Sequence, residues 1–366
     1  MSRRPRVLLY SPTPRADRGG VQRVMDDLER ALPARGLDVS RAGPDEDEGA
    51  GGVRFEARTD AGAGGLPLLG ALPGAVASAS RLARILRRVR PDVVNMHFVM
   101  GEAAYLLALR RAFGYRVVLS AHGGDLLRPT PQMRRHVPRV LRAADAVTVV
   151  SRELDAAARA FAGPGFAARY VPNGADTAFW SPGAAAPDPH RVVAVGRLLP
   201  VKGFDLLVDA VSGLRDVTVT IFGEGAERGA LEARIEAAGL GGRVGLAGHA
   251  SPEAVRDALR GAALFAMPSR GEGMPLALLE ALACGVPAVA TAVGGIPDVL
   301  TPGTGLVVPP GDVGALRDAL ARALSDASPL SRGAARRRAE DHAQDACHDA
   351  YAEVLRAEAR AAGWRG

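Results

Sequence analysis

Two glutamates, Glu272 and Glu280, stand with seven residues between them at the start of an apolar segment. Gly273 and Pro275 lie between them and favour a loop that turns into a helix, because proline suits the first helical turn. The free N–H groups and positive dipole end of such a helix bind an anion. Carboxylates do not bind that anion, but they accept hydrogen bonds from hydroxyl groups on either side of it. The pattern therefore predicts a ligand whose anionic group lies between two hydroxyl-bearing parts, as in a nucleotide sugar.

The whole stretch Pro268–Leu300, PSRGEGMPLALLEALACGVPAVATAVGGIPDVL, carries this pattern in order. It resembles the retaining glycosyltransferases of family 4, which have the GT-B fold. The resemblance implies that Glu280 accepts hydrogen bonds from the ribose hydroxyls and that Glu272 contacts hydroxyls of the transferred sugar. It also implies that the donor diphosphate is bound by the backbone of Gly273, Met274, Pro275 and Leu276.

Lys202 is the only lysine in the chain, and it lies in GRLLPVKGFDLLVDA, five residues after Arg197. A compact, rotatable ammonium suits contact with a phosphate differently from a planar guanidinium. The string resembles the family motif whose Arg and Lys bind the donor diphosphate. The resemblance implies that Arg197 and Lys202 stabilise the charge that grows on the leaving phosphate. The alternative is a surface lysine without a function.

The first half of the chain holds further candidates. Gly19 and Gly20 precede a helix predicted from about Val21, and they resemble the family's GG-V loop, which faces the donor phosphate and the acceptor. His122 follows a predicted strand in AHGGD, where the family has a histidine beside the donor sugar, and Asp125 belongs to the same loop. The alternatives are a plain turn for the glycines and a structural role for His122.

Two other residues carry weaker signals. Asn173, in VPNGAD, resembles a family motif at the edge between the domains, where a structural turn and a ligand contact are equally open. Glu224, in FGEG, follows a predicted strand and is placed to approach the nucleotide. The family more often has Asp-Gly at this place, which weakens that assignment.

Short apolar segments alternate with helical segments along the chain, which predicts an α/β protein with parallel sheets. The first series includes Arg6–Tyr10, Asp92–His97 and Arg116–Ala121, and a second series begins at Val192–Val195. A single long helix is predicted over about Arg332–Glu358.

With the resemblance, this alternation predicts the GT-B fold, two Rossmann-like domains whose parallel sheets face across a central cleft. The predicted domains are residues 1–180 on the acceptor side and 190–344 on the donor side, joined near Ser181–Pro189. The resemblance implies that the helix at about 345–366 packs back on the first domain.

Composition narrows the class of protein. The chain has 366 residues, 48 % of them hydrophobic but only 4 % aromatic, which is enough for two cores packed by aliphatic side chains. Two cysteines, Cys284 and Cys347, cannot make a disulfide framework, so we expect a reducing compartment. The N-terminus lacks the apolar core of a signal peptide, and no run approaches the roughly 20 apolar residues of a membrane span. We therefore expect a cytoplasmic protein.

The formal charge of +6 and basic segments such as Arg81–Arg90 raise the question of a polyanionic partner. Arginines alternate with leucines and isoleucine in this segment, as on a solvated helix face over a core stripe, so no nucleic-acid partner is predicted. An anionic substrate or peripheral contact with the inner membrane face is the better match. The apolar stretch Leu66–Ala77 contains two prolines and is interpreted as a mobile loop, with a membrane or hydrophobic-acceptor contact as the alternative.

No metal site is predicted, because the acidic run Asp45–Asp47 lies in a Gly-rich loop away from a strand end. The resemblance implies a metal-independent enzyme without a cofactor, whose co-substrate is a nucleoside-diphosphate sugar. UDP-sugars are expected first and GDP-mannose next, with a glycan, lipid-linked or small-molecule hydroxyl as acceptor. Two rival functions remain open. One is a sugar-phosphate-handling GT-B enzyme, and the other is a non-catalytic nucleotide-sugar binding module.

Overall fold

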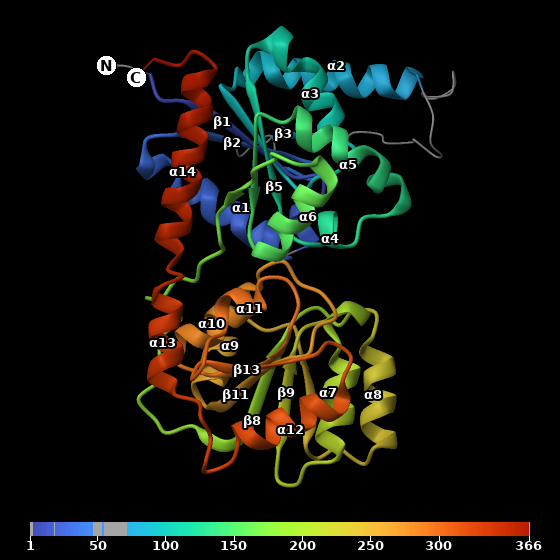
Figure 1. The fold of residues 1–366 in the computed structure, drawn as a ribbon, viewed down its shortest axis with the longest axis vertical. Helices are drawn as coiled ribbons and strands as arrows, with labels where there is room; N and C mark the ends of the chain where they lie inside the picture. Colours follow the sequence, from blue (N-terminus) through green and yellow to red (C-terminus); the bar gives the residue numbers. More distant parts are fainter. Residues whose placement is uncertain (1–2, 18, 47–52, 55–71, 366) are drawn as a thin grey trace. The chain divides into compact units, whose positions relative to one another are not determined.

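The computed structural model describes residues 3–17, 19–46, 53–54 and 72–365 (Figure 1). The chain forms two compact units. Unit 1 consists of Met1–Pro172 and Cys347–Gly366, and unit 2 consists of Asn173–Ala346. The chain thus enters unit 2 at Asn173, ahead of the predicted join at Ser181–Pro189.

Unit 1 is built on a parallel sheet with the strand order β3-β2-β1-β4-β5-β6-β7. Its central strands are buried almost throughout, which explains why they appear as continuous apolar runs in the sequence. The strands are β1 (Arg6–Tyr10), β2 (Asp38–Gly43), β3 (Val53–Arg54), β4 (Val93–His97), β5 (Arg116–Ala121), β6 (Ala146–Val149) and β7 (Arg169–Tyr170).

The helices of unit 1 cover both faces of its sheet. From β3 onward every crossover runs in one direction along the sheet, so the right-handed rule places α2, α3, α5 and α6 on one face and α1 on the other. Figure 1 shows α1 and α14 on the side away from α3, α5 and α6. The helices are α1 (Gly20–Ala31), α2 (Leu72–Val89), α3 (Ala103–Phe113), α4 (Gly124–Leu127), α5 (Pro131–Ala143), α6 (Arg152–Ala162) and most of α14 (Gln344–Ala361).

The loop predicted over Leu66–Ala77 is partly wrong. Residues 72–77 form the first turns of α2, because the apolar and small side chains after the second proline continue into the helix. Residues 66–71 lie outside the described part of the chain, as do residues 47–52 of the loop predicted over Asp45–Gly52.

Unit 2 has a second parallel sheet with the order β10-β9-β8-β11-β12-β13. Its core is aliphatic, with Val192, Ile221, Leu264 and Val289 fully buried along its strands. The strands are β8 (Asp188–Val195), β9 (Thr218–Phe222), β10 (Val244–Gly248), β11 (Ala262–Met267), β12 (Ala288–Thr291) and β13 (Gly305–Val308). The helices are α7 (Phe204–Ser212), α8 (Arg228–Ala237), α9 (Pro252–Arg260), α10 (Leu276–Ala283), α11 (Ile296–Val299), α12 (Val313–Ala323) and α13 (Arg332–Glu340).

The single helix predicted over Arg332–Glu358 is wrong, because the structure divides it into α13 and α14. Between the two helices the backbone turns aside to pair with Ala175. The Ala175 N–H donates to the His342 carbonyl at 3.0 Å, and the Gln344 N–H donates to the Ala175 carbonyl at 2.9 Å. The partner is distant in sequence, so helical periodicity gives no sign of the break.

The C-terminal residues from Cys347 onward belong to unit 1. Arg35 pairs with Asp349 at 2.6 Å, and the Arg116 Nε donates to Glu358 at 2.8 Å. Tyr351 of α14 is completely buried. Across the described residues, we find no helix that is both long and apolar enough to cross a bilayer.

Candidate functional site

The candidate residues of unit 2 follow two neighbouring strands at the point where the strand order reverses. β8 lies between β9 and β11. The chain passes from β8 to β9 and β10 on one side of it and then crosses to β11, β12 and β13 on the other side. In such sheets, ligands bind beyond the carboxyl ends of the strands at this switch point. The loop after β8 carries Arg197 and Lys202, and the loop after β11 carries Glu272.

Lys202 and Glu272 are in direct contact. The Lys202 Nζ donates to the Glu272 Oε1 at 2.7 Å, and the Ser269 hydroxyl donates to the same oxygen at 2.6 Å. The side chain of Glu272 is 8 % exposed and that of Lys202 is 21 % exposed. The site thus holds a cation and an anion in place, half-shielded from water, where electrostatic contacts are stronger than in bulk solvent.

Backbone contacts hold the two loops together. The Arg270 N–H donates to the Val201 carbonyl at 2.7 Å. Gly203 has a φ of +66°, and a Cβ at this position would lie 2.1 Å from the Pro268 carbonyl oxygen. Only glycine allows this approach, so the turn that carries Lys202 is fixed against the end of β11. Arg270 also donates to both carboxylate oxygens of Asp205, which lowers the pKa of that carboxyl.

The loop before α10 is also held by its neighbours. Pro275 is the N-cap of the helix and not its first helical residue as predicted, because its ψ of 120° is extended. The Gly295 N–H donates to the Gly273 carbonyl at 2.5 Å. Gly294 has a φ of +59°, and a Cβ there would lie 2.2 Å from the Glu272 carbonyl oxygen. Gly294 and Gly295 have no Cβ, so their backbone packs directly against the backbone of Glu272 and Gly273.

Asn173 has a structural contact in this loop. Its Nδ2 donates to the Met274 carbonyl at 2.8 Å, and the residue is buried. This hydrogen bond ties Asn173 to the loop that precedes α10. The Asn173 Oδ1 is buried without a partner among the described residues.

The remaining candidates of unit 2 differ in their surroundings. Arg197 is exposed just after β8, and Glu280 is buried on α10 at 3 % exposure. Glu224 is exposed, and its carboxylate is held by Arg228 at 2.9 and 3.0 Å, which lowers its pKa. A nucleotide contact by Glu224 would have to replace this pair, whereas Arg197 has no ion pair among the residues described.

In unit 1 the strand order reverses between β1 and β4, and the candidate loops follow β1 and β5. Gly19 is the N-cap of α1 and Gly20 is its first residue, so their N–H groups lie at a helix start. The chain ahead of Gly19 is anchored by Asp45, whose carboxylate accepts from the Arg15 and Ala16 N–H groups at 2.7 and 2.9 Å.

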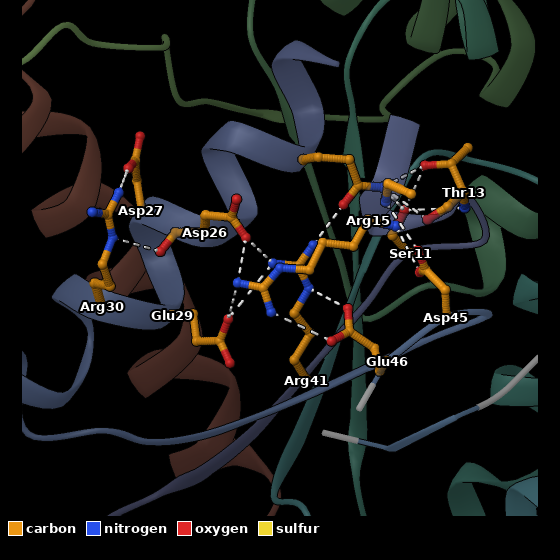
Figure 2. Close-up of polar contacts among 12 residues, drawn as sticks. Ser11, Thr13, Arg15, Asp26, Asp27, Glu29, Arg30, Arg41, Asp45 and Glu46 are labelled. Atoms are coloured by element: carbon orange, nitrogen blue, oxygen red, sulfur yellow. Dashed lines mark hydrogen bonds and ion pairs between the residues drawn. The ribbon is translucent and has the colours of Figure 1, made fainter. Parts of the chain in front are cut away.

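Figure 2 shows the ionic network behind this loop. Arg41 on β2 is 1 % exposed and pairs with Glu46 at 2.7 Å and with Asp26 on α1. Arg15 joins the network at 2.9 Å from Asp26. Asp45 and Glu46, part of the acidic run considered for metal binding, are thus held by nitrogen donors. No cluster able to hold a metal ion occurs within the described ranges.

His122 and Asp125 lie in the loop after β5. The Asp125 carboxylate accepts from the N–H groups of Val99, Gly123 and His122 at 3.0, 2.8 and 3.2 Å. Asp125 is 4 % exposed, and its burial raises its pKa. It therefore anchors the loops after β4 and β5 and fixes the backbone of His122.

His97 contacts the candidate residue His122, and the sequence analysis did not single it out. Its Nδ1 lies 2.9 Å from the His122 Nε2, and the two rings stack with centroids 5.0 Å apart. Burial lowers the pKa of His97 well below its usual value and that of His122 to about 3, so both rings stay neutral at pH 7. The signal available in the sequence was a histidine at the carboxyl end of β4, next to the switch point.

Comparison with known proteins defines the family. The model for glycosyltransferase family 4 matches residues 18–179, and that for glycosyl transferases group 1 matches residues 179–344. A GDP-mannose-dependent alpha-(1-6)-phosphatidylinositol monomannoside mannosyltransferase of Mycolicibacterium smegmatis is 34 % identical over an alignment 275 residues long, which covers 68 % of this chain and 71 % of the relative. The chain therefore belongs to the family 4, group 1 glycosyltransferases, and it is a glycosyltransferase.

Solved structures show the fold. Sucrose-phosphate synthase from Thermosynechococcus elongatus matches with a TM-score of 0.82 at 22 % identity, over 97 % of this chain and 98 % of that one. Anabaena HepE, in complex with UDP and glucose, matches with a TM-score of 0.76 at 19 % identity, over 96 % and 100 %. The GT-B fold predicted from the sequence is thereby confirmed.

Proposed function

We propose that this glycosyltransferase moves a sugar from a nucleoside-diphosphate sugar to a hydroxyl acceptor with retention of anomeric configuration. The observation that carries the proposal is the Lys202–Glu272 pair at the switch point of unit 2, 2.7 Å apart at the ends of adjacent strands. A nucleotide sugar has a diphosphate next to a sugar. A binding site for it therefore needs a cation for the phosphate beside a carboxylate that accepts from the sugar hydroxyls.

Each residue of unit 2 has a defined task in this proposal. Arg197 and Lys202 bind the diphosphate, and the N–H groups at the start of α10 add to that contact. Glu272 accepts hydrogen bonds from hydroxyls of the transferred sugar. Glu280, buried on α10, accepts them from the ribose.

The proposed reaction takes place on one face of the sugar. The bond between the anomeric carbon and the phosphate oxygen breaks, and the acceptor oxygen bonds to that carbon from the same side. The acceptor proton passes to the leaving phosphate, so no protein base takes part. Arg197 and Lys202 stabilise the charge on the phosphate, so no metal is required. The resemblance assigns the transferred sugar to His122 and the acceptor side to Gly20.

For the donor we propose GDP-mannose first and UDP-sugars second. The support is the name of the M. smegmatis relative, which uses GDP-mannose, while HepE binds UDP. That relative acts on a phosphatidylinositol mannoside, so we propose a glycolipid or lipid-linked glycan as acceptor.

The surface of unit 1 supports a peripheral contact with an anionic membrane. In the segment 72–144 the acidic residues are Asp92, Glu102 and Asp125, and all three are buried. The exposed arginines of α2, α3 and α5 therefore have no exposed acid within this segment to balance them. Anionic lipids attract such residues by roughly 1 kcal/mol each. The exposed residues are Arg81, Arg84, Arg87, Arg88, Arg111, Arg134, Arg135, Arg139 and Arg142.

The test is a donor panel of GDP-mannose, UDP-glucose and UDP-N-acetylglucosamine with lipid-linked and soluble acceptors, each with EDTA and with added Mg²⁺. Transfer from one donor in EDTA, with a product that retains the donor's anomeric configuration by proton NMR, is the expected result. Inversion would exclude the one-face reaction. Turnover near that of the wild type in Glu272→Ala would overturn the proposed site.

A further inference from the structure

Ser269 shares the one carboxylate oxygen that also binds the lysine. Its hydroxyl donates to the Glu272 Oε1 at 2.6 Å, and the Lys202 Nζ donates to the same atom at 2.7 Å. We infer that Ser269 is a positioning residue that keeps Glu272 in place when Lys202 moves from the carboxylate to the donor diphosphate. This inference rests on the proposed function and adds to it a residue that no family motif used above had singled out.

The two donors differ in their freedom to move. Lys202 has a flexible four-carbon stem and is partly exposed, so its ammonium can turn to a diphosphate that carries more negative charge than one carboxylate. Ser269 is 1 % exposed, and its own carbonyl accepts a hydrogen bond from the Thr291 hydroxyl, which is equally buried. The serine is therefore the fixed donor and the lysine is the transferable one.

Glu272 needs that fixed donor once the lysine has left. Its side chain is 8 % exposed, and a buried carboxylate without a partner is strongly disfavoured. The Ser269 hydroxyl retains one bond to the carboxylate and keeps its orientation. Both protein bonds end on Oε1, which leaves Oε2 to accept from a hydroxyl of the transferred sugar.

The local sequence explains why a serine is suited to this task. Ser269 precedes Glu272 by three residues in a loop that must turn back toward Lys202, so a short side chain reaches the carboxylate within one turn. The Gly294 backbone packs closely against the Glu272 carbonyl, since a Cβ on Gly294 would lie 2.2 Å from that oxygen. The orientation of the carboxylate then depends on the hydroxyl.

The experiment compares Ser269→Ala with the wild type, using GDP against GDP-mannose and UDP against UDP-glucose as probes. Binding is measured by calorimetry, and kcat and KM are measured with the donor that supports transfer. We expect the affinity for the nucleotide sugar and the kcat each to fall about tenfold, the scale of one hydrogen bond to a charged group. The affinity for the nucleoside diphosphate should stay within about twofold, because Lys202 and the α10 backbone are unchanged.

Two control variants separate the possible outcomes. Ser251→Ala removes a hydroxyl that accepts from the Ala254 N–H and caps α9, so it reports a general loss of stability without touching the site. Glu272→Ala tests the proposed function itself. Suppose that Glu272→Ala loses turnover while Ser269→Ala keeps the wild-type ratio of affinities for nucleotide sugar and nucleoside diphosphate. This result would overturn the role of Ser269 and leave the proposed function standing.

Other results are equally decisive. Normal turnover in Glu272→Ala would overturn the proposed function on which the inference rests. If Ser269→Ala lowers the affinities for nucleoside diphosphate and nucleotide sugar equally, the serine is merely structural and the inference is overturned. A Ser269→Thr variant that restores the ratio of the two affinities would support the hydroxyl as the acting group.

Discussion

The two sheets of the chain present opposite chemistry at their switch points. In unit 2, a lysine and a glutamate form an ion pair beyond β8 and β11. In unit 1, next to the switch point, His97 at the carboxyl end of β4 and His122 after β5 are buried and share a hydrogen bond, and burial keeps both neutral. One parallel α/β framework thus carries fixed charges in one case and uncharged dipoles in the other.

The difference follows from what surrounds each pair. Lys202 remains partly exposed, so water and the neighbouring carboxylate stabilise its charge, whereas His97 is fully buried against the neutral ring of Tyr351, with centroids 6.0 Å apart. A charge is useful where a diphosphate leaves. In the proposed reaction, a neutral ring would not repel the positive charge that grows on a sugar as its bond to phosphate breaks. The same kind of sheet therefore positions both pairs of side chains, and the burial of each pair determines whether its members are charged.

The largest expected effect lies on the charged side. Lys202→Ala should lower kcat at least ~10²-fold, the scale of losing one preorganised electrostatic contact. Lys202→Arg should not restore the rate, because a planar guanidinium cannot take the place of the compact, rotatable ammonium on the donor diphosphate. Steady-state kinetics with the donor found in the panel is the measurement. Full activity in Lys202→Arg would show that charge alone matters at this position.

The second largest effect concerns Gly294, whose backbone packs against the loop that carries Glu272. Gly294→Ala should lower the free energy of unfolding by about 2–3 kcal/mol, because a left-handed φ is strained and the new Cβ overlaps the Glu272 carbonyl. Urea denaturation measures this change. Gly229→Ala is the matched control, since a Cβ there meets nothing within 4 Å. Equal stabilities of the two variants would contradict the support described for the loop.

The neutral side predicts a dependence of stability on pH. The pKa of His122 falls from 6.5 to about 3 on folding, so between these values the unfolded chain binds a proton that the folded chain does not. Stability should therefore fall as the pH drops below 6.5, by up to about 1.4 kcal/mol per pH unit for this group. His97 acts in the same direction.

Urea unfolding at pH 7, 6 and 5 tests this slope. His122→Asn should reduce the slope between pH 6 and 5, because the variant lacks the group that titrates on unfolding. Using the difference between the two proteins removes the opposing contribution of carboxyls such as Asp125, whose pKa is raised by burial. Identical slopes in both proteins would mean that His122 is protonated in the folded state.

The smallest expected effect is on membrane binding, and it distinguishes the surface of unit 1 from that of unit 2. Arg84→Ala on α2 should weaken binding to phosphatidylglycerol vesicles about fivefold at low salt, since one basic residue contributes roughly 1 kcal/mol near an anionic surface. Arg322→Ala on α12 of unit 2 should leave binding unchanged. Cosedimentation with phosphatidylglycerol and with phosphatidylcholine vesicles gives the comparison. Equal losses in the two variants would assign the attraction to net charge and not to unit 1.

The sequence predicted the fold wherever a strand is buried on both faces. Arg6–Tyr10 and Arg116–Ala121 were predicted with the bounds that the structure has, because apolar runs of this kind belong to parallel sheets. β2 was missed because it carries Arg41, a buried charge that is balanced by contacts with Asp26, Glu46 and Gln22. Such a balance depends on partners brought together by folding.

The candidate site shows the same limit. Lys202 and Glu272 were both singled out, yet nothing in their spacing says that they touch, since this depends on β8 and β11 being neighbours. Ser269 and His97 were not singled out, because their contacts with Glu272 and His122 form only when the chain folds. Their roles become visible only as bonds to Glu272 and His122.

Helix α14 begins in unit 2 and belongs to unit 1 from Cys347 onward. A ribosome releases this helix only after the whole of unit 2 has emerged, so until then the side of the unit 1 sheet that carries α1 lacks α14. The later domain in the sequence is then the first that can finish folding, contrary to the usual N-to-C order. During that interval His97 lacks its ring contact with Tyr351.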